Sequence, residues 1–122
     1  MPVLAWGGVA IHRHDVRTRT RHDLSVLGAG TPVVVQVHDP SCRLCRRLMA
    51  NTLAALGERD DVLYRVADLT DREGAAFGAR YGVGKVTLLL FDGRGRHVDT
   101  VQGVTPPEAL AERFAARFRL PG

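Results

Sequence analysis

The sequence has few cysteines, few aromatic residues and no long apolar run. Two cysteines among 122 residues cannot build a disulfide framework, which excludes a small scaffold held together by disulfides. No stretch approaches the roughly 18 apolar residues of a membrane-spanning helix. Aromatic residues make up 6% of the chain and the positive charge is scattered, so a nucleic-acid-binding surface is not expected. The length suits one globular domain with its own hydrophobic core.

Lysine is almost absent, since Lys85 is the only lysine among the 17 Lys and Arg residues, and the formal net charge is +4. The sequence also lacks a convincing secretion signal, because the apolar stretch 3–11 is short and has no basic residue before it. We therefore expect a cytoplasmic protein, with the periplasm as the alternative for a chain whose leader has been removed.

Both cysteines lie in one motif, Cys42-Arg43-Leu44-Cys45, directly after the apolar run 33–37. The run predicts a strand buried on both faces, and the apolar stripe after the motif predicts a helix that ends at Gly57. Cys42 would lie at the helix N-terminus, where free N–H groups and the helix dipole stabilise a thiolate. Cys45 would lie one turn further along, close enough to form a disulfide with Cys42. This arrangement is typical of a thiol–disulfide exchange site.

The remaining pattern alternates strands and helices. We expect a strand over 62–67, a helix that opens with a capping box at 70–73 and runs to about 81, strands over 87–91 and 96–101 joined by a turn at 92–95, and a last helix capped by 105–108. A β-α-β unit followed by a hairpin gives a mixed sheet with helices on both faces. Within the hairpin, His97 and Asp99 are interpreted as surface residues, because spacing identifies no partner for them.

Residues 1–30 are interpreted as an N-terminal extension to a domain that spans 31–122. Arginine and histidine alternate with other residues over 12–22, which indicates an exposed strand or arm. A short helix is expected over 23–27, closed by the glycines that follow. The arm is interpreted as a solvated sheet edge, with a docking patch for an acidic partner as the alternative.

The chain resembles thioredoxin-fold proteins over about residues 31–120, in three stretches: the strand–loop–helix 33–56 around the cysteines, Tyr81-Gly82-Val83 shortly before the strand 87–91, and Asp92-Gly93-Arg94-Gly95 with Gly103 beyond it. The resemblance implies an α/β fold with a mixed central sheet of four to five strands and helices on both faces. It implies that Cys42 is the exposed nucleophile and that Cys45 resolves the mixed disulfide formed with a protein disulfide or dithiol partner. A recycling reductase or reductant would complete the cycle, and neither cofactor nor metal is implied.

The chain departs from the thioredoxin pattern at four places. Val86 stands where thioredoxins have a cis-proline, and a trans peptide is expected there, because a cis bond before valine would cost about 2.5–4 kcal/mol. Gln36, expected to be a hydrogen-bonded core residue, replaces a buried aspartate that accepts the proton of the resolving thiol, and glutamine cannot titrate. Ser41 replaces a tryptophan, and Arg-Leu replaces Gly-Pro between the cysteines. These departures predict a narrow set of partners.

Residues around the cysteines are predicted to contact the substrate, namely Ser41, Arg43, Leu44, Lys85 and Val86. Arg43, together with Arg46 and Arg47, is also expected to lower the pKa of the Cys42 thiol. Protein–thiol exchange is therefore expected to take place at the start of the helix.

The alternative function is a non-catalytic thioredoxin-fold module that binds a partner or carries a metal, with Cys42, Cys45 and His38 as candidate ligands. A zinc site is disfavoured, because tetrahedral zinc takes four ligands and no second Cys/His cluster has the required spacing. The sequence leaves the oligomeric state open.

Overall fold

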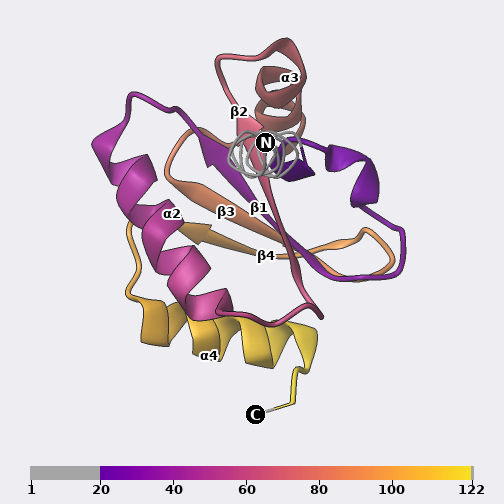
Figure 1. Ribbon diagram of the computed structural model, residues 1–122. Coiled ribbons are helices and arrows are strands. Elements are labelled where there is room, and N and C mark those ends of the chain that lie inside the picture. The colour runs from indigo at the N-terminus through magenta and orange to yellow at the C-terminus, as the bar shows by residue number, and fades with distance from the viewer. Residues whose placement is uncertain (1–19, 122) are drawn as a thin grey trace, which may run out of the picture.

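The structure is a computed structural model that describes residues 20–121 (Figure 1). The elements that lie wholly within this range are η1 (Leu24–Val26), β1 (Val33–His38), α2 (Arg43–Leu56), β2 (Leu63–Asp68), α3 (Arg72–Tyr81), β3 (Thr87–Phe91), β4 (His97–Gln102) and α4 (Pro107–Phe118). Each predicted strand and helix from residue 33 onward is present, with ends shifted by one or two residues for most of them. No helix in the described range is long and apolar enough to cross a membrane.

The four strands form one mixed sheet in the order β2-β1-β3-β4. β1 is parallel to β2 and antiparallel to β3, and β3 and β4 form the predicted hairpin. All six residues of β1 are buried, as expected of a central strand covered on both faces. The predicted α/β fold with a mixed sheet is confirmed, with four strands in the described part of the chain.

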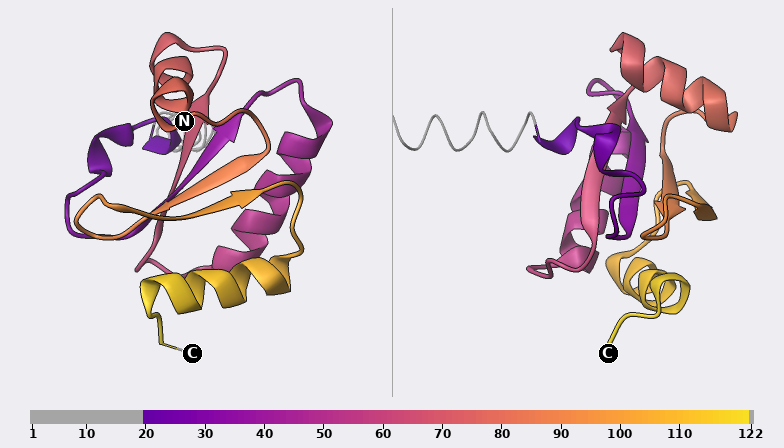
Figure 2. Two further views of the ribbon diagram at one scale, coloured as in Figure 1. Left: turned by 180° about the vertical axis from the view of Figure 1, so that it is seen from behind. Right: turned by 90° about the vertical axis from the view of Figure 1, so that its right-hand side faces the viewer.

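Helices cover both faces of the sheet. Leu48 of α2 and Leu110 of α4 belong to one buried apolar cluster, and these two helices lie next to each other (Figures 1 and 2). Phe77 of α3 belongs to a second cluster. Because side chains alternate along a strand, β1 supplies Val34 to the first cluster and Val35 to the second. α3 therefore covers the sheet face opposite to α2 and α4.

Two predicted helix caps are wrong in detail. The N–H and the hydroxyl of Thr70 both donate to Oδ1 of Asp68, at 2.8 and 2.6 Å, and the N-cap of α3 is Asp71. The hydroxyl of Thr105 donates to the carbonyl oxygen of Gly103 at 3.2 Å, and the N-cap of α4 is Pro106. In both cases a nearer acceptor upstream takes the hydroxyl that was expected to cap the helix.

The segment before β1 packs on the sheet. Leu24 and Val26 lie against the cluster on the α3 side, and Nε of Arg65 donates to the carbonyl oxygen of Asp23 at 3.1 Å. The short helix expected over 23–27 is the 3-10 helix η1. Residues 20–22 of the expected arm have helical and turn conformations rather than extended ones, and the rest of the arm lies outside the described residues.

Candidate functional site

A tight turn between β1 and α2 positions the first cysteine. Oδ1 of Asp39 accepts hydrogen bonds from the N–H and the hydroxyl of Ser41 at 2.9 and 2.8 Å, and the N–H of Cys42 donates to the Asp39 carbonyl oxygen at 3.0 Å. Cys42 is the N-cap of α2, and its Sγ accepts the N–H of Cys45 at 3.2 Å. The predicted position of Cys42 at the helix N-terminus is confirmed.

The two thiols have opposite environments. Cys42 is partly exposed, whereas Cys45 is fully buried, and both are free thiols. A hydrogen bond from the Cys45 thiol is the main cause that lowers the pKa of Cys42, and the Cys45 backbone N–H and the charge of Lys85 act in the same direction. Burial raises the pKa of Cys45, and its bond to Cys42 adds to the effect. Of the two thiols, Cys42 is therefore the one that deprotonates at the lower pH.

Lys85, and not an arginine, is the cation with the largest effect on the Cys42 thiolate. The expectation that Arg43, Arg46 and Arg47 are the cations that lower the pKa of Cys42 was therefore wrong, because Lys85 has the larger effect. Lys85 also lowers the pKa of Asp39, so its charge acts on both the turn and the thiol. A lysine 43 residues away along the chain reaches the site because β3 lies beside β1 in the sheet.

Gln36 lies in a buried hydrogen-bond network behind Cys45. Its Nε2 donates to the Cys45 carbonyl oxygen at 2.8 Å and lies 3.1 Å from Nδ1 of His38, while the Tyr64 hydroxyl donates to its Oε1 at 2.8 Å. Burial lowers the pKa of His38 and raises that of Tyr64, so both are neutral near pH 7. The interpretation of Gln36 as a hydrogen-bonded core residue is confirmed, and the network fixes the first turn of α2 against β1 and β2.

Val86 adopts an unusual backbone conformation next to the cysteines. The described residues contain no cis peptide, as expected for this position, but φ of Val86 is +61°. An L-residue in this left-handed region is strained by roughly 1–2 kcal/mol. A hydrogen bond from the Val86 N–H partly offsets the rise in the pKa of Cys45. The Val86 carbonyl oxygen accepts a hydrogen bond from the N–H of Gly103 at 2.8 Å. The strained peptide therefore joins the dithiol to the loop that follows β4.

The predicted substrate-contacting residues surround Cys42. Ser41 and Arg43 are exposed neighbours of Cys42 in the chain, and Leu44 has 53% of its surface exposed. Lys85 and Val86 approach from the loop before β3. The Ser41 hydroxyl is already bonded to Asp39, so it shapes the turn.

Two residues that shape the site, Asp39 and Tyr64, were not predicted from the sequence. Asp39 forms the turn, and the Asp-Pro-Ser sequence is a recognisable signal for such an Asx turn. Tyr64 reaches Gln36 from β2, and only the parallel register, which pairs Val34 with Tyr64 and Gln36 with Val66, reveals that contact.

One group in the described range brings together three side chains with metal-binding atoms, which all lie within 4.8 Å of one another: His22, Asp68 and Asp71. Neither cysteine belongs to this group. Asp68 is buried and its Oδ1 is occupied by Thr70.

A mixed sheet between layers of helices, with a dithiol at the start of the helix that follows the central strand, defines the thioredoxin fold. The chain belongs to the thioredoxin-like family, because it matches the model of the thioredoxin-like domain over residues 24–117.

Relatives agree with this assignment. The chain is 27% identical over 111 residues to the chloroplastic M-type thioredoxin of Pisum sativum, an alignment that covers 91% of this chain and 64% of the pea protein. It is 28% identical to thioredoxin 1 of Synechococcus elongatus, over 70% of this chain and 79% of that protein. The fold is similar to that of a thioredoxin-like protein from Clostridium perfringens, with a TM-score of 0.66, 16% identity and coverage of 79% of this chain and 78% of that one. The chain thus spans less than two thirds of the pea protein.

Proposed function

We propose that the protein is a thiol–disulfide oxidoreductase in which Cys42 attacks and Cys45 resolves. The observation that carries the proposal is the contrast between a partly exposed Cys42 with a lowered pKa and a buried Cys45 with a raised pKa. Nucleophilic thiols require the thiolate form and access to the partner, which only Cys42 combines. Membership of the thioredoxin-like family supports thiol–disulfide chemistry in general.

The reaction consists of two exchanges. The Cys42 thiolate attacks one sulfur of a partner disulfide, so that a Cys42–partner bond forms and the second partner sulfur leaves as a thiolate, which takes up a proton. Cys45 then loses its proton and attacks Cys42 Sγ, so that the intramolecular disulfide forms and the first partner sulfur leaves. Two electrons pass to the partner, and a reductase or a thiol reductant returns the oxidised pair to the dithiol.

The lowered pKa of Cys42 favours the reduced pair. We therefore expect a potential above the roughly −270 mV of a Gly-Pro thioredoxin. The partners are a narrow set of protein disulfides, approached by Leu44 and Lys85, and the proposed location is the cytoplasm.

Resolution is expected to be the slow exchange, because Gln36 accepts no proton from Cys45. Gln36→Asp would place a titratable group in the network and should speed decay of the mixed disulfide in single-turnover experiments, with little change in the first attack. Gln36→Asn is the matched control, since it shortens the side chain without adding a titratable group. Equal decay rates in all three proteins would contradict this role for Gln36.

A disulfide-reduction assay tests the proposal. The reduced full chain is mixed with bis(2-hydroxyethyl) disulfide, a neutral small disulfide, and thiol release is followed. Cys42→Ser should reduce the rate to that of the uncatalysed reaction, whereas Cys45→Ser should accumulate a mixed disulfide that mass spectrometry detects at Cys42. Failure of the wild-type protein to react would favour the non-catalytic binding module, to which the departures at Gln36 and Val86 also point.

A further inference from the structure

The charges of α2 oppose its own dipole. Its sequence contains Arg43, Arg46 and Arg47 in the first two turns and no acidic residue at all. The N-terminus of a helix carries partial positive charge, so an exposed cation there costs about 0.3–1 kcal/mol, with the effect fading beyond the first turn. The position of Arg43 is therefore unfavourable for the helix that carries it, and the dipole gives no support to Arg46 and Arg47 in the second turn.

The charges of α3 and α4 match their helix dipoles, with an acidic residue in the first turn and a basic residue in the last turn. α3 has Glu73 in its first turn, beside Arg72, and Arg80 in its last turn. α4 has Glu108 in its first turn and Arg117 in its last turn. Among the three α-helices that lie wholly within residues 20–121, this charge pattern is specific to the helix that holds the dithiol.

Arg43, Arg46 and Arg47 form no ion pair within the described part of the chain. All three side chains are exposed, and Arg43 and Arg47 form neither an ion pair nor a side-chain hydrogen bond with the described residues. Arg46 donates only to the carbonyl oxygen of Pro40, at 2.9 Å. Lys85 has a larger effect than any of them on the Cys42 thiolate.

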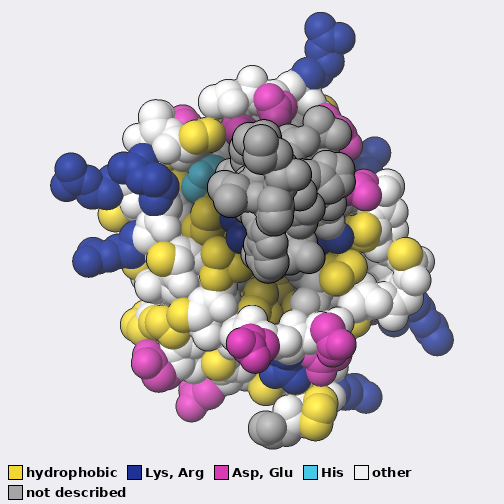
Figure 3. Space-filling model, in the orientation of Figure 1, with side chains coloured by type: hydrophobic (Ala, Val, Ile, Leu, Met, Phe, Trp, Pro, Cys, Tyr) yellow, Lys and Arg dark blue, Asp and Glu magenta, His cyan; other side chains and the backbone are white. Residues whose placement is uncertain are grey.

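We infer that Arg43, Arg46 and Arg47, here termed the arginine surface, bind acidic residues that flank the reactive disulfide of a partner protein. The inference rests on the proposed function, because it concerns the substrate of that site. Figure 3 shows Lys and Arg side chains that project over the first half of α2. Leu44, which follows Arg43 in the chain, exposes 53% of its surface. The partner that fits is an acidic polypeptide with an apolar residue beside its disulfide.

Charge complementarity of this kind acts mainly on the association rate. Cations around a reactive site raise the rate of encounter with an acidic partner by 10- to 1,000-fold, and salt suppresses the effect. The signature of the arginine surface is therefore a preference for acidic disulfides that disappears at high ionic strength.

The test compares two disulfide-bonded peptides that are identical except that four residues flanking the cysteines are Glu in one and Gln in the other. Their second-order rates with the reduced full chain are measured by stopped flow at low salt and at high salt. The Glu peptide should react about tenfold faster at low salt, with nearly equal rates at high salt. The triple substitution Arg43→Gln, Arg46→Gln, Arg47→Gln should remove the preference, so that the two peptides react with the variant at equal rates at low salt.

The matched control removes the same charge elsewhere, through Arg72→Gln, Arg80→Gln and Arg94→Gln, which are exposed residues outside the site. The control should keep the preference; loss of the preference in both triple variants would assign it to net charge and overturn the inference. Equal rates of the wild-type protein with both peptides would overturn the inference but leave the proposed function intact. No reaction with either peptide or with the small neutral disulfide would instead contradict the proposed function. The single variant Arg43→Gln repeats the measurement with minimal perturbation of the fold.

Discussion

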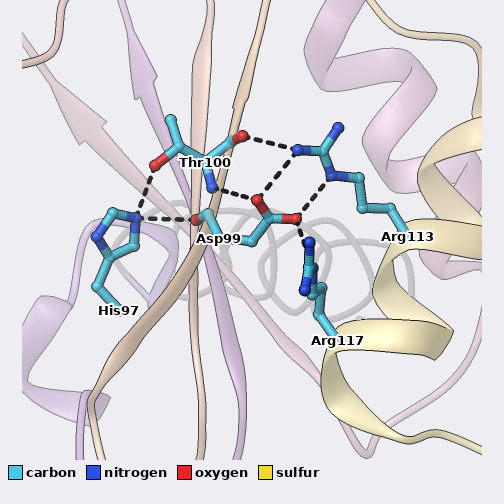
Figure 4. A network of polar contacts seen from close by, with 5 residues as sticks. All are labelled: His97, Asp99, Thr100, Arg113 and Arg117. Carbon is cyan, nitrogen blue, oxygen red and sulfur yellow. Dashed lines mark hydrogen bonds and ion pairs between the residues drawn. The ribbon is translucent and has the colours of Figure 1, made fainter.

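α2 and α4 lie next to each other and both expose arginines, but their arginines have different surroundings (Figures 1 and 4). On α4, Arg113 forms a two-pronged ion pair with Asp99 of β4, at 2.7 and 3.0 Å, and Nε of Arg117 lies 3.1 Å from the same carboxylate. On α2, the side chains of Arg43 and Arg47 contact no carboxylate among the described residues.

The comparison separates two uses of one residue type. The guanidinium groups of α4 neutralise a carboxylate that is only 11% exposed, and they attach α4 to the sheet edge. Arg117 also lies in the last turn of its helix, where the dipole favours a cation. On α2, Arg43 is placed against the dipole, and neither Arg43 nor Arg47 forms an ion pair with the described residues. Charge on α4 serves the fold, and charge on α2 is proposed to serve recognition.

The largest expected effect concerns the α4 side of the comparison. Hydrogen bonds from Arg113 are the main cause that lowers the pKa of Asp99 to about 2, below the roughly 3.9 of an unfolded chain. Asp99→Asn should therefore lower the free energy of unfolding by about 2 kcal/mol at pH 7. Because the folded pKa is the lower one, this contribution is complete only above about pH 5 and is lost progressively as the pH falls through about 2.

Urea denaturation between pH 2 and 7 measures this effect. The control is Asp60→Asn, at an exposed aspartate without an ion pair in the described range, and it should match the wild-type protein. Neither substitution should change the rate of disulfide reduction. A stability of Asp99→Asn equal to the wild type at pH 7 would show that the network of Figure 4 contributes nothing to the fold.

The dithiol site and the end of α4 also differ in backbone strain. Arg119 adopts φ of +55° at the C-cap of α4, where left-handed residues are common, whereas Val86 adopts φ of +61° beside the dithiol with no helix end to explain it. Proline requires φ near −65°, so Val86→Pro should destabilise the fold by more than about 1 kcal/mol and slow the exchange. Val86→Asn is the control, because asparagine tolerates the left-handed region. Equal thermal stability of Val86→Pro and the wild type would contradict this backbone conformation.

Two charge reversals test whether Arg43 destabilises α2. They should change the free energy of unfolding by small amounts of opposite sign at the start of α2 and at the end of α3. Arg43→Glu places an anion at the start of α2 and should raise the free energy of unfolding by about 0.5–1 kcal/mol. The same change at the end of α3, Arg80→Glu, should lower it by a similar amount. Denaturation at low ionic strength measures both. If Arg43→Glu lowers the stability, the arginine has a structural role and the comparison fails.

The sequence predicted what depends on local pattern. The apolar run of β1, the end of α2 at Gly57 and the order of the two cysteines followed from strand burial, helix punctuation and helix polarity. The sequence could not predict contacts that depend on the pairing of distant segments. Lys85 was predicted to lie near the cysteines, but its larger effect than the arginines on the Cys42 thiolate was not predicted, and Tyr64 reaches Gln36 only because of the parallel register.

Asp99 shows the same limit within a hairpin. The interpretation of His97 and Asp99 as plain surface residues was wrong for Asp99, because a register shift between Leu90 and Phe91 inserts an extra residue into β4. His97 pairs with Phe91 and Asp99 pairs with Leu90, so their side chains lie on opposite faces although they are two residues apart. A bulge of this kind leaves no mark in the alternation of the sequence, yet it directs Asp99 towards α4.

The pH dependence of alkylation at each cysteine tests the central claim most directly, namely that the start of α2 presents Cys42 as the thiolate nucleophile. The reduced full chain is treated with iodoacetamide from pH 4 to 10, and the modification of each cysteine is followed by mass spectrometry of its peptide. Cys42 should react first, with a titration midpoint below the roughly 8.5 of a free cysteine, because the bond from Cys45 and the charge of Lys85 lower its pKa. Cys45 should react slowly and only at higher pH, because it is buried. Faster reaction of Cys45, or a midpoint of Cys42 at or above 8.5, would contradict the assignment.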